Sequence, residues 1–262
     1  MFFAALGLLG GSYVLLISLM LAADAIFTTP QHFLAALAKP EIQYAIRLTL
    51  VTCSISAILS LWVAVPLGYV LSRYRFPGKF LVDTLIDIPV VLPPLVLGLS
   101  LLILFHLNWG TWKLEDWLRQ EIGFPVTFKI PAVILAQFSV ACAFAVRTMR
   151  VTFDEIDPRA EQVARTLGCS RAQAFLRVAL PQAGRGLCAA GTIAWARSLG
   201  EFGPILVFAG ATRMQTEVLS TTVFLELSVG NLEASVAVSL VMVLMAVVVL
   251  VVLRSLGMEH GG

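Results

Sequence analysis

The sequence has little charge. Of its 262 residues, 13% are Asp, Glu, Lys or Arg, whereas 59% are hydrophobic. Soluble domains carry about 25% charged residues, so this composition argues against a soluble fold. The scarcity of charge indicates a chain that lies mostly in a membrane.

Cysteine and histidine are also scarce, and neither is grouped. Four cysteines show no paired spacing, and we interpret them as small apolar packing residues: Cys53, Cys142, Cys169 and Cys188. Three histidines lie apart from one another, with no carboxylate or cysteine at metal-ligand spacing: His32, His106 and His260. We therefore expect no disulfide framework and no metal site.

The sequence motifs of common enzymes are missing. There is no G-x-x-x-x-G-K-[ST] phosphate loop, and the only Gly-Lys pair lies in "PGKF" at 77–80. Serine elbows and H-E-x-x-H helices are absent too. We expect no catalytic residues, no cofactor, no nucleic-acid partner and no ATP hydrolysis by this chain alone.

What the sequence does contain is a set of six apolar runs, each 17 to 24 residues long: 7–27, 48–71, 84–105, 130–146, 187–210 and 234–253. Each can cross a hydrocarbon core of about 30 Å as a helix. Two of the runs contain prolines or charges, and neighbouring helices can satisfy backbone groups that a proline frees. The sequence thus predicts an all-α integral membrane protein with six transmembrane helices.

The first run has a second interpretation as a signal peptide, because "ADA" at 23–25 resembles a cleavage site. However, no Lys or Arg precedes Phe27, and the run exceeds the usual 7–15 or so apolar residues of a signal peptide. We therefore favour a transmembrane helix.

The placement of the basic residues predicts the orientation. With the N-terminus inside, the cytoplasmic segments hold 11 of the 18 Lys and Arg residues and the external segments hold six. The last, Arg197, falls within a span. We expect both termini to be cytoplasmic and residues 1–262 to form a single transmembrane domain in the inner (plasma) membrane, in contact with lipid.

Two loops between the runs have distinct patterns. The external loop 106–129 contains "WGTWKLEDWLRQEIG", whose three tryptophans suit a helix at the membrane interface. The cytoplasmic loop 149–185 predicts two short helices. Asp157 and Pro158 begin the first helix, and Gly168 ends it. The second opens with the capping-box pair Ser170 and Gln173, and Pro181 is expected to end it.

The first of these loop helices has apolar residues at helical spacing and a polar face that bears Glu161, Gln162, Arg165 and Thr166. Such a helix could lie on anionic lipid, where Lys and Arg should dominate the polar face. Because both charge signs are present here, a protein partner is favoured.

The fifth run, at 187–210, is interrupted by charges and small residues. Arg197 and Glu201 are four apart, so they share a helix face and can neutralise each other. Ionisable groups in a membrane usually face a cavity or a partner. Gly200, Gly203 and Pro204 favour a kinked segment that lines a pathway, although a purely structural charge pair is the alternative. "DIPVVLPPLVLG" at 87–98 interrupts the third run in a similar way.

These motifs resemble the permease subunits of ATP-binding-cassette (ABC) importers. Those proteins carry E-A-A, three residues, Gly, nine residues and I-x-L-P in a cytoplasmic loop. Here Gly168 is followed nine residues later by "VALP", which ends at Pro181. The first triplet departs from the pattern, since 162–164 reads Gln-Val-Ala, with Glu161 one place earlier. "ARSLGEFG" at 196–203 and "PVVLPPLVLG" at 89–98 resemble the branch that transports molybdate, tungstate or sulfate.

The resemblance implies a type I ABC importer permease fold, a homodimer, two cytoplasmic ATPase subunits and an external solute-binding protein. It also implies two groups of site residues. The residues that couple to the ATPase would be Glu161, Gln162, Ala164, Arg165, Gly168 and Pro181. The residues of the pathway would be Arg197, Gly200, Glu201, Phe202, Gly203 and Pro204, with Phe202 as a candidate gate. An ion-coupled secondary transporter or channel is the alternative function, and a membrane-bound enzyme or assembly factor is a third.

Overall fold

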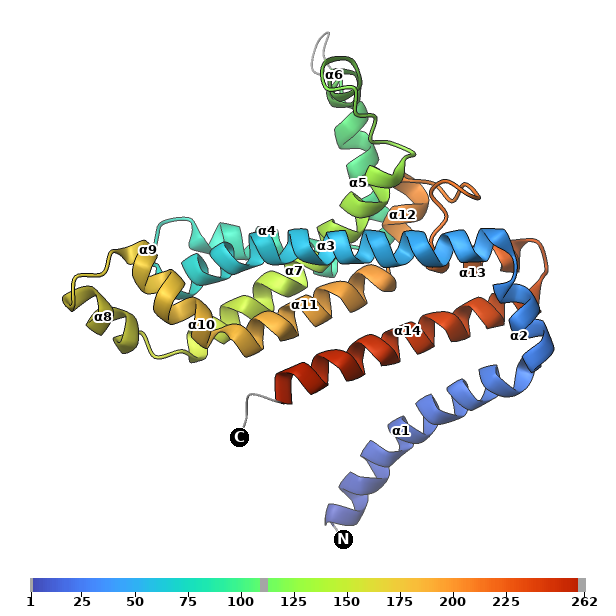
Figure 1. Ribbon diagram of the computed structural model, residues 1–262, viewed down its shortest axis with the longest axis horizontal. Helices are drawn as coiled ribbons and strands as arrows, with labels where there is room; N and C mark the ends of the chain where they lie inside the picture. The colour runs from blue at the N-terminus through green and yellow to red at the C-terminus, as the bar shows by residue number, and fades with distance from the viewer. Residues whose placement is uncertain (1, 109–112, 259–262) are drawn as a thin grey trace.

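The computed structural model describes residues 2–108 and 113–258, and every regular element among them is helical (Figure 1). In chain order the elements are α1 (Phe2–Phe27), α2 (Pro30–Leu37), α3 (Pro40–Arg73), α4 (Lys79–Val91), α5 (Pro94–His106), α6 (Leu114–Glu121), α7 (Ile130–Glu155), α8 (Arg159–Thr166), α9 (Arg171–Ala174), a π-helical turn η1 (Phe175–Ala179), α10 (Leu180–Gln182), α11 (Gly184–Leu199), α12 (Gly203–Phe208), α13 (Leu219–Ser228) and α14 (Leu232–Met258). The predicted all-α class is therefore confirmed for this part of the chain.

The centre of the fold is a bundle in which α3, α7, α11 and α14 run side by side (Figure 1). The most extensive contact joins α3 to α7, whose facing surfaces are rich in buried Ala, Ser, Thr and Gly. A Cβ atom on Gly68 would lie 2.8 Å from the Met149 Cβ atom. Small residues of this kind let the backbones of membrane helices approach closely, where dispersion forces and not hydrophobicity hold helices together.

The described residues contain four helices long and apolar enough to span a membrane, or five if the bent pair α4 and α5 counts as one. These four are α1, α3, α7 and α14, and they coincide with four of the expected spans. The other two expected spans, 84–105 and 187–210, are not single helices. Within the described residues, six continuous transmembrane helices are therefore not found.

The third expected span bends by 115° between α4 and α5. Leu92 and Pro93 both have extended backbone angles, with ψ of 140° and 133°. Each of them precedes a proline, and the ring of the next residue disfavours a helical conformation there. Two successive prolines therefore turn the chain sharply.

The fifth expected span breaks between α11 and α12. α11 ends at Leu199, and α12 begins at Gly203 with Pro204 in its first turn. Because Pro204 has no N–H group, it cannot continue the hydrogen-bond ladder of α11. The three residues between the helices, 200–202, are not helical. Glu201 therefore lies in the break itself, and Arg197 lies in the last turn of α11.

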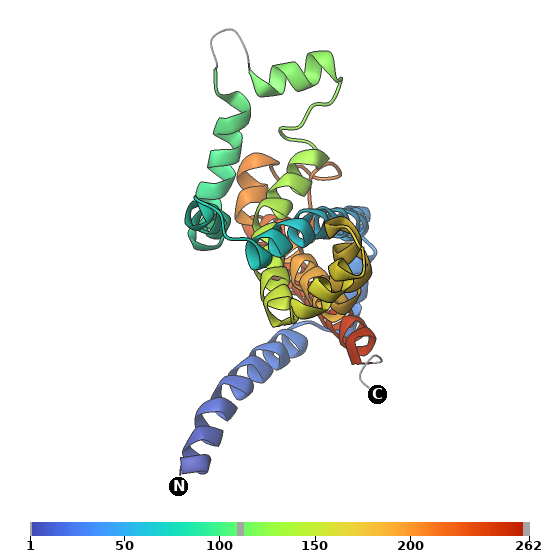
Figure 2. The same cartoon turned by 90° about the vertical axis from the view of Figure 1, so that its left-hand side faces the viewer.

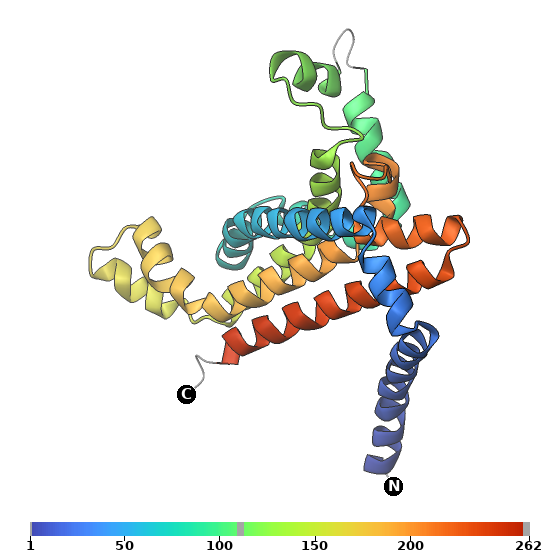
Figure 3. The same cartoon turned by 45° about the vertical axis from the view of Figure 1, so that its right-hand side comes forward.

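Three helices, α1, α5 and α6, extend away from the bundle (Figure 2, Figure 3). Figure 2 shows α1 running away from the other helices, and none of its residues from Gly10 to Phe27 is buried. On the opposite side, α5 and α6 extend away from the bundle, as Figure 3 shows from another direction. α6 confirms a helix within the loop 106–129, where Trp117 is 38% exposed. The other two tryptophans of that loop lie outside the described residues.

Candidate functional site

The first helix of the loop 149–185 is α8, and it begins and ends close to the predicted positions. An Asp157 carboxylate oxygen accepts the N–H of Arg159 at 2.9 Å, which satisfies a donor at the start of the helix. At the other end, Gly168 has φ of +94°, and the N–H groups of Gly168 and Cys169 bond back to the last turn. This left-handed end requires glycine because a Cβ atom disfavours positive φ.

The second helix begins as predicted but does not end where expected. The Ser170 hydroxyl accepts the Gln173 N–H at 3.2 Å, and the Gln173 side chain accepts the Ser170 N–H at 2.8 Å. The prediction that Pro181 stops this helix is wrong, because the helical chain continues through η1 and α10. A proline ring would clash with the carbonyl one turn earlier, and the wider π-helical turn accommodates it.

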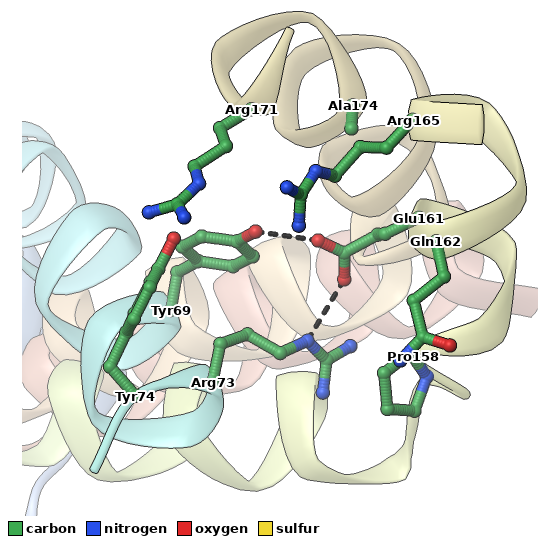
Figure 4. Close-up of a pocket in the computed structure, with 9 residues that line it drawn as sticks. All are labelled: Tyr69, Arg73, Tyr74, Pro158, Glu161, Gln162, Arg165, Arg171 and Ala174. Atoms are coloured by element: carbon green, nitrogen blue, oxygen red, sulfur yellow. Dashed lines mark hydrogen bonds and ion pairs between the residues drawn. The ribbon is translucent and has the colours of Figure 1, made fainter. Parts of the chain in front are cut away.

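Glu161 faces the interior of the chain, so the structure places it differently from the polar face expected for it. It is 7% exposed. Its two carboxylate oxygens accept hydrogen bonds from the Tyr69 hydroxyl at 2.5 Å and from Arg73 Nε at 2.9 Å (Figure 4). The same arginine donates to the carbonyls of Phe153 at 2.8 Å and Ile156 at 2.9 Å. α8 is therefore tied to the end of α3 and, through Arg73, to the end of α7.

A cavity of about 170 Å³ lies beside this contact, between the end of α3 and the helices α8 and α9 (Figure 4). Its lining residues are Tyr69, Arg73, Tyr74, Pro158, Glu161, Gln162, Arg165, Arg171 and Ala174. Three expected coupling residues, Glu161, Gln162 and Arg165, are thus brought to one cavity. The other three lie outside the lining, with Gly168 and Pro181 exposed and Ala164 half-buried.

The expected pathway residues cluster at the break between α11 and α12. Arg197 lies 3.7 Å from Glu201, so the predicted pair is present. The guanidinium also stacks over the Phe144 ring at 4.9 Å. Glu201 is 3% exposed, whereas Arg197 and Gly200 are exposed. The ring of Phe202 packs on Phe224, with centroids 5.4 Å apart. Gly203 and Pro204 are buried.

The two broken spans interlock, which sequence reasoning did not anticipate. A Cβ atom on Gly98 would lie 2.7 Å from the Pro204 Cα atom, and one on Gly203 would lie 2.8 Å from the Pro94 Cβ atom. Each broken span thus has a glycine that packs directly against a proline of the other broken span. The motifs at 89–98 and 196–203, which lie far apart in the sequence, therefore meet where α5 contacts α12.

Two further ion pairs join α4 to α7. Arg147 Nε lies 2.7 Å from Asp87, and an Arg150 amino group lies 2.8 Å from Asp83. The sequence predicts Arg197 as the one cation within a span, but α7 continues past the expected boundary at 146 and includes Arg147 and Arg150. The sequence spacing does indicate these ion pairs. Asp83 and Asp87 are four residues apart, and Arg147 and Arg150 are three apart, so each pair of like charges lies on one face of its helix.

A cluster of charged groups surrounds Glu226 of α13, which is 2% exposed. Its carboxylate accepts hydrogen bonds from Arg213 at 2.8 Å and Asn231 at 2.9 Å, and Lys39 Nζ lies 3.8 Å away. The hydrogen bond to Glu226 raises the pKa of Arg213 above its ordinary value. The buried carboxylate is thus fully compensated.

Glu217, in the loop before α13, is buried without such partners. Its exposed fraction is 0%, and neither carboxylate oxygen has a hydrogen-bond partner within the described residues. The nearby Thr222 hydroxyl donates its proton to the Val218 carbonyl instead. Burial therefore raises the pKa of the Glu217 carboxyl above its ordinary value, against the opposing effect of the Arg213 charge.

Comparison with known families identifies the class of protein. Residues 64–257 match the family described as "Binding-protein-dependent transport system inner membrane component". The chain belongs to this family. The permease is therefore a transport subunit, and both the loop 149–185 and the two broken spans lie within the matched region.

Curated relatives cover most of the permease. It is 32% identical over 85% of its length to a sulfate transport system permease protein of Escherichia coli K12, of which it covers 79%. It is 33% identical over 82% of its length to a molybdate/tungstate transport system permease protein of Thermococcus kodakarensis, of which it covers 78%. A molybdenum transport system permease protein of Mycobacterium tuberculosis is 33% identical over 90% of the permease and 88% of that protein.

The fold of the permease is that of a solved transporter. A crystal structure of a bacterial ABC transporter involved in the import of the acidic polysaccharide alginate superposes with a TM-score of 0.76. The match covers 99% of the permease and 96% of that chain, at 17% identity. At this level of identity the likeness concerns the fold alone.

Proposed function

We propose that the permease forms the membrane pathway of an ATP-driven importer for a tetrahedral oxyanion such as sulfate, molybdate or tungstate. The observation that carries this proposal is the shared substrate chemistry of relatives that cover more than three quarters of the permease. A phosphate loop is absent from the sequence. ATP would therefore be bound and hydrolysed by a separate cytoplasmic subunit, and the permease itself would need no cofactor or metal.

The proposed topology has six membrane crossings with both termini in the cytoplasm. α4 with α5, and α11 with α12, would each make one broken crossing. Broken helices of this kind are tolerated where protein or a water-filled cavity surrounds the freed backbone. The excess of Lys and Arg on the side that holds the loop 149–185 supports this orientation in an inner membrane.

The proposed assembly contains two copies of the permease, an ATPase dimer and an external solute-binding protein. An isologous dimer is the commonest closed arrangement for identical chains. α1 supports it, because this apolar helix buries no residue from Gly10 to Phe27 against its own bundle and is free to pack on a second copy or on lipid. A related fold was solved in complex with a periplasmic protein that carries an alginate pentasaccharide, which supports a binding protein here.

The proposed coupling mechanism uses the contact around Glu161. When the ATPase closes on α8, the hydrogen bonds from Tyr69 and Arg73 would transmit the movement of α8 to α3. Arg73 also holds the end of α7, so both long helices would respond together. The breaks at 92–93 and 200–202 are the points where such a movement can change the pathway.

The proposed pathway passes the break between α11 and α12. Arg197 would meet the anion, and Glu201 would reduce the attraction so that the anion is released. Gly200, Gly203 and Pro204 would give the segment its kinked shape. Phe202, packed on Phe224, would act as the gate.

Gly168 provides the test of this proposal. In proteoliposomes with the ATPase and the binding protein, we expect ATP-dependent uptake of radiolabelled sulfate or molybdate. Gly168→Val should abolish stimulation of ATP hydrolysis by the loaded binding protein, because valine is strained at φ +94° and disrupts the end of α8. Gly78→Val is the matched control: φ there is +86°, and a Cβ atom meets nothing within 4 Å at either glycine.

Two outcomes would contradict the proposed function. Uptake driven by an ion gradient without ATP would identify a secondary transporter. Equal stimulation of ATP hydrolysis in wild-type permease and Gly168→Val would remove α8 from the coupling mechanism.

A further inference from the structure

The cavity beside Glu161 contains more positive charge than its own carboxylate can compensate. Three arginines, Arg73, Arg165 and Arg171, line it together with one carboxylate, Glu161. That carboxylate is bound by Arg73 and Tyr69. Arg165 and Arg171 are exposed and have no ion-pair partner within the described residues, although both point toward the cavity (Figure 4). Two guanidinium groups therefore remain for an external anion.

The inward position of Glu161 also changes the character of the exposed surface. The sequence predicts a mixed polar face on α8, but its one acid is buried. The exposed polar side chains that remain beside the cavity are Gln162, Arg165 and Arg171. A partner that fits this surface must supply negative charge.

We propose that the cavity receives an acidic side chain of the ATPase, with Arg165 and Arg171 as its ligands. This inference rests on the proposed function, which places α8 against that subunit. The planar guanidinium group presents paired N–H donors that match the two oxygens of a carboxylate. A carboxylate of the ATPase bound between α8 and α9 would thus hold α8, the helix that Glu161 links to α3.

The length of α3 favours a protein partner over lipid. Its 34 residues extend about 51 Å, whereas the hydrocarbon core is about 30 Å thick and the headgroups bring the total to about 40–45 Å. The cavity lies at the far end of α3, beside Arg73, its last residue. This end extends into the cytoplasm, where the ATPase lies.

The experiment measures binding of the purified ATPase to the permease in nanodiscs. We expect Arg165→Gln and Arg171→Gln each to weaken binding about tenfold, because each removes a charged hydrogen bond to a carboxylate. Raising the salt concentration should weaken wild-type binding and affect the double variant less. Arg177→Gln is the control, since Arg177 is an exposed arginine of the same loop outside the cavity lining.

A charge reversal identifies the partner. Arg165→Glu should abolish binding, and replacing one acidic residue of the ATPase docking surface with Arg should restore it, which a double-mutant cycle quantifies. Equal affinities for wild-type permease, Arg165→Gln and Arg171→Gln would overturn the inference. A loss seen only in nanodiscs with anionic lipid would overturn it in favour of lipid contacts. Failure of wild-type permease to bind any ATPase would instead contradict the proposed function.

Discussion

At the scale of single residues, two buried glutamates show how neighbours decide the state of a carboxylate. Glu161 accepts hydrogen bonds from Tyr69 and Arg73, so its charge is compensated and it can join two helices. Glu217 is buried more deeply and has no such donors among the described residues. A buried group left unpaired costs about 1–3 kcal/mol, so Glu217 should lower the stability of the permease when it is charged.

We predict that Glu217→Gln stabilises the permease at pH 8 by about 1–3 kcal/mol. Burial raises the Glu217 pKa in the folded state above the ordinary value of 4.5, so the folded state binds more protons than the unfolded state. Stability is then greatest below that ordinary pKa and is lost as the pH rises through the folded-state pKa. The measurement is the unfolding temperature in nanodiscs from pH 4 to pH 8.

The glutamine variant should lose this pH dependence and differ little from wild-type at pH 4. Glu233→Gln is a suitable control, because Glu233 is exposed and pairs with His32 at 3.2 Å. A Glu217→Gln variant less stable than wild-type at pH 8 would show that the carboxylate has a partner.

At the scale of elements, the broken spans are held together by shape and not by charge. Gly98 packs against Pro204, and Gly203 packs against Pro94, so closely that neither glycine has room for a Cβ atom. Helices in a membrane gain no hydrophobic energy from meeting, so close packing of small residues is what joins them. The two breaks should therefore move as one unit.

We predict that Gly98→Ala and Gly203→Ala each destabilise the permease by about 1–3 kcal/mol through overpacking. In both cases the nearest obstructing atom belongs to a proline, which cannot move aside as a flexible side chain could. Gly200→Ala in the same motif should have little effect on stability, because its nearest atom would be a carbonyl oxygen at 3.8 Å. Unfolding temperatures of the three variants provide the comparison, and equal values would refute the interlocking contact.

At the scale of the whole molecule, the bundle of α3, α7, α11 and α14 has the proposed coupling and pathway elements at its two ends. The helices α8 and α9 lie at one end, and the contact between α5 and α12 lies toward the other (Figure 1). Within the bundle, α3 and α7 pack through buried side chains that are mostly small. The bundle is suited to carry a movement from α8 to the breaks, provided that a second copy completes the pathway.

We predict that a cysteine at Phe202 reacts with small water-soluble thiol reagents at a rate that depends on the nucleotide bound to the ATPase. The background variant lacks the four natural cysteines, Cys53, Cys142, Cys169 and Cys188. Leu16→Cys on α1 is the control, because Leu16 is 55% exposed on a helix remote from the break and should show no such dependence. Protection of position 202 in every nucleotide state would favour a purely structural role for the segment.

The sequence alone determined the features that depend on neighbours along the chain. The length of the apolar runs determines that α1, α3, α7 and α14 are long helices able to span a membrane. Local hydrogen bonding and positive φ set the start of α8, its end at Gly168 and the capping box of Ser170 and Gln173. The breaks near Pro93 and Pro204 follow equally from the missing N–H and the restricted backbone of proline.

Only the tertiary structure decided which side chains meet across long stretches of sequence. The partners of Glu161 come from α3, about 90 residues away, and helical periodicity alone could not show that this carboxylate turns inward. The glycine and proline contacts between α5 and α12 depend on two backbones approaching within the radius of a Cβ atom. Such contacts carry no local signal, because they arise from packing geometry and not from the conformational preference of any one segment.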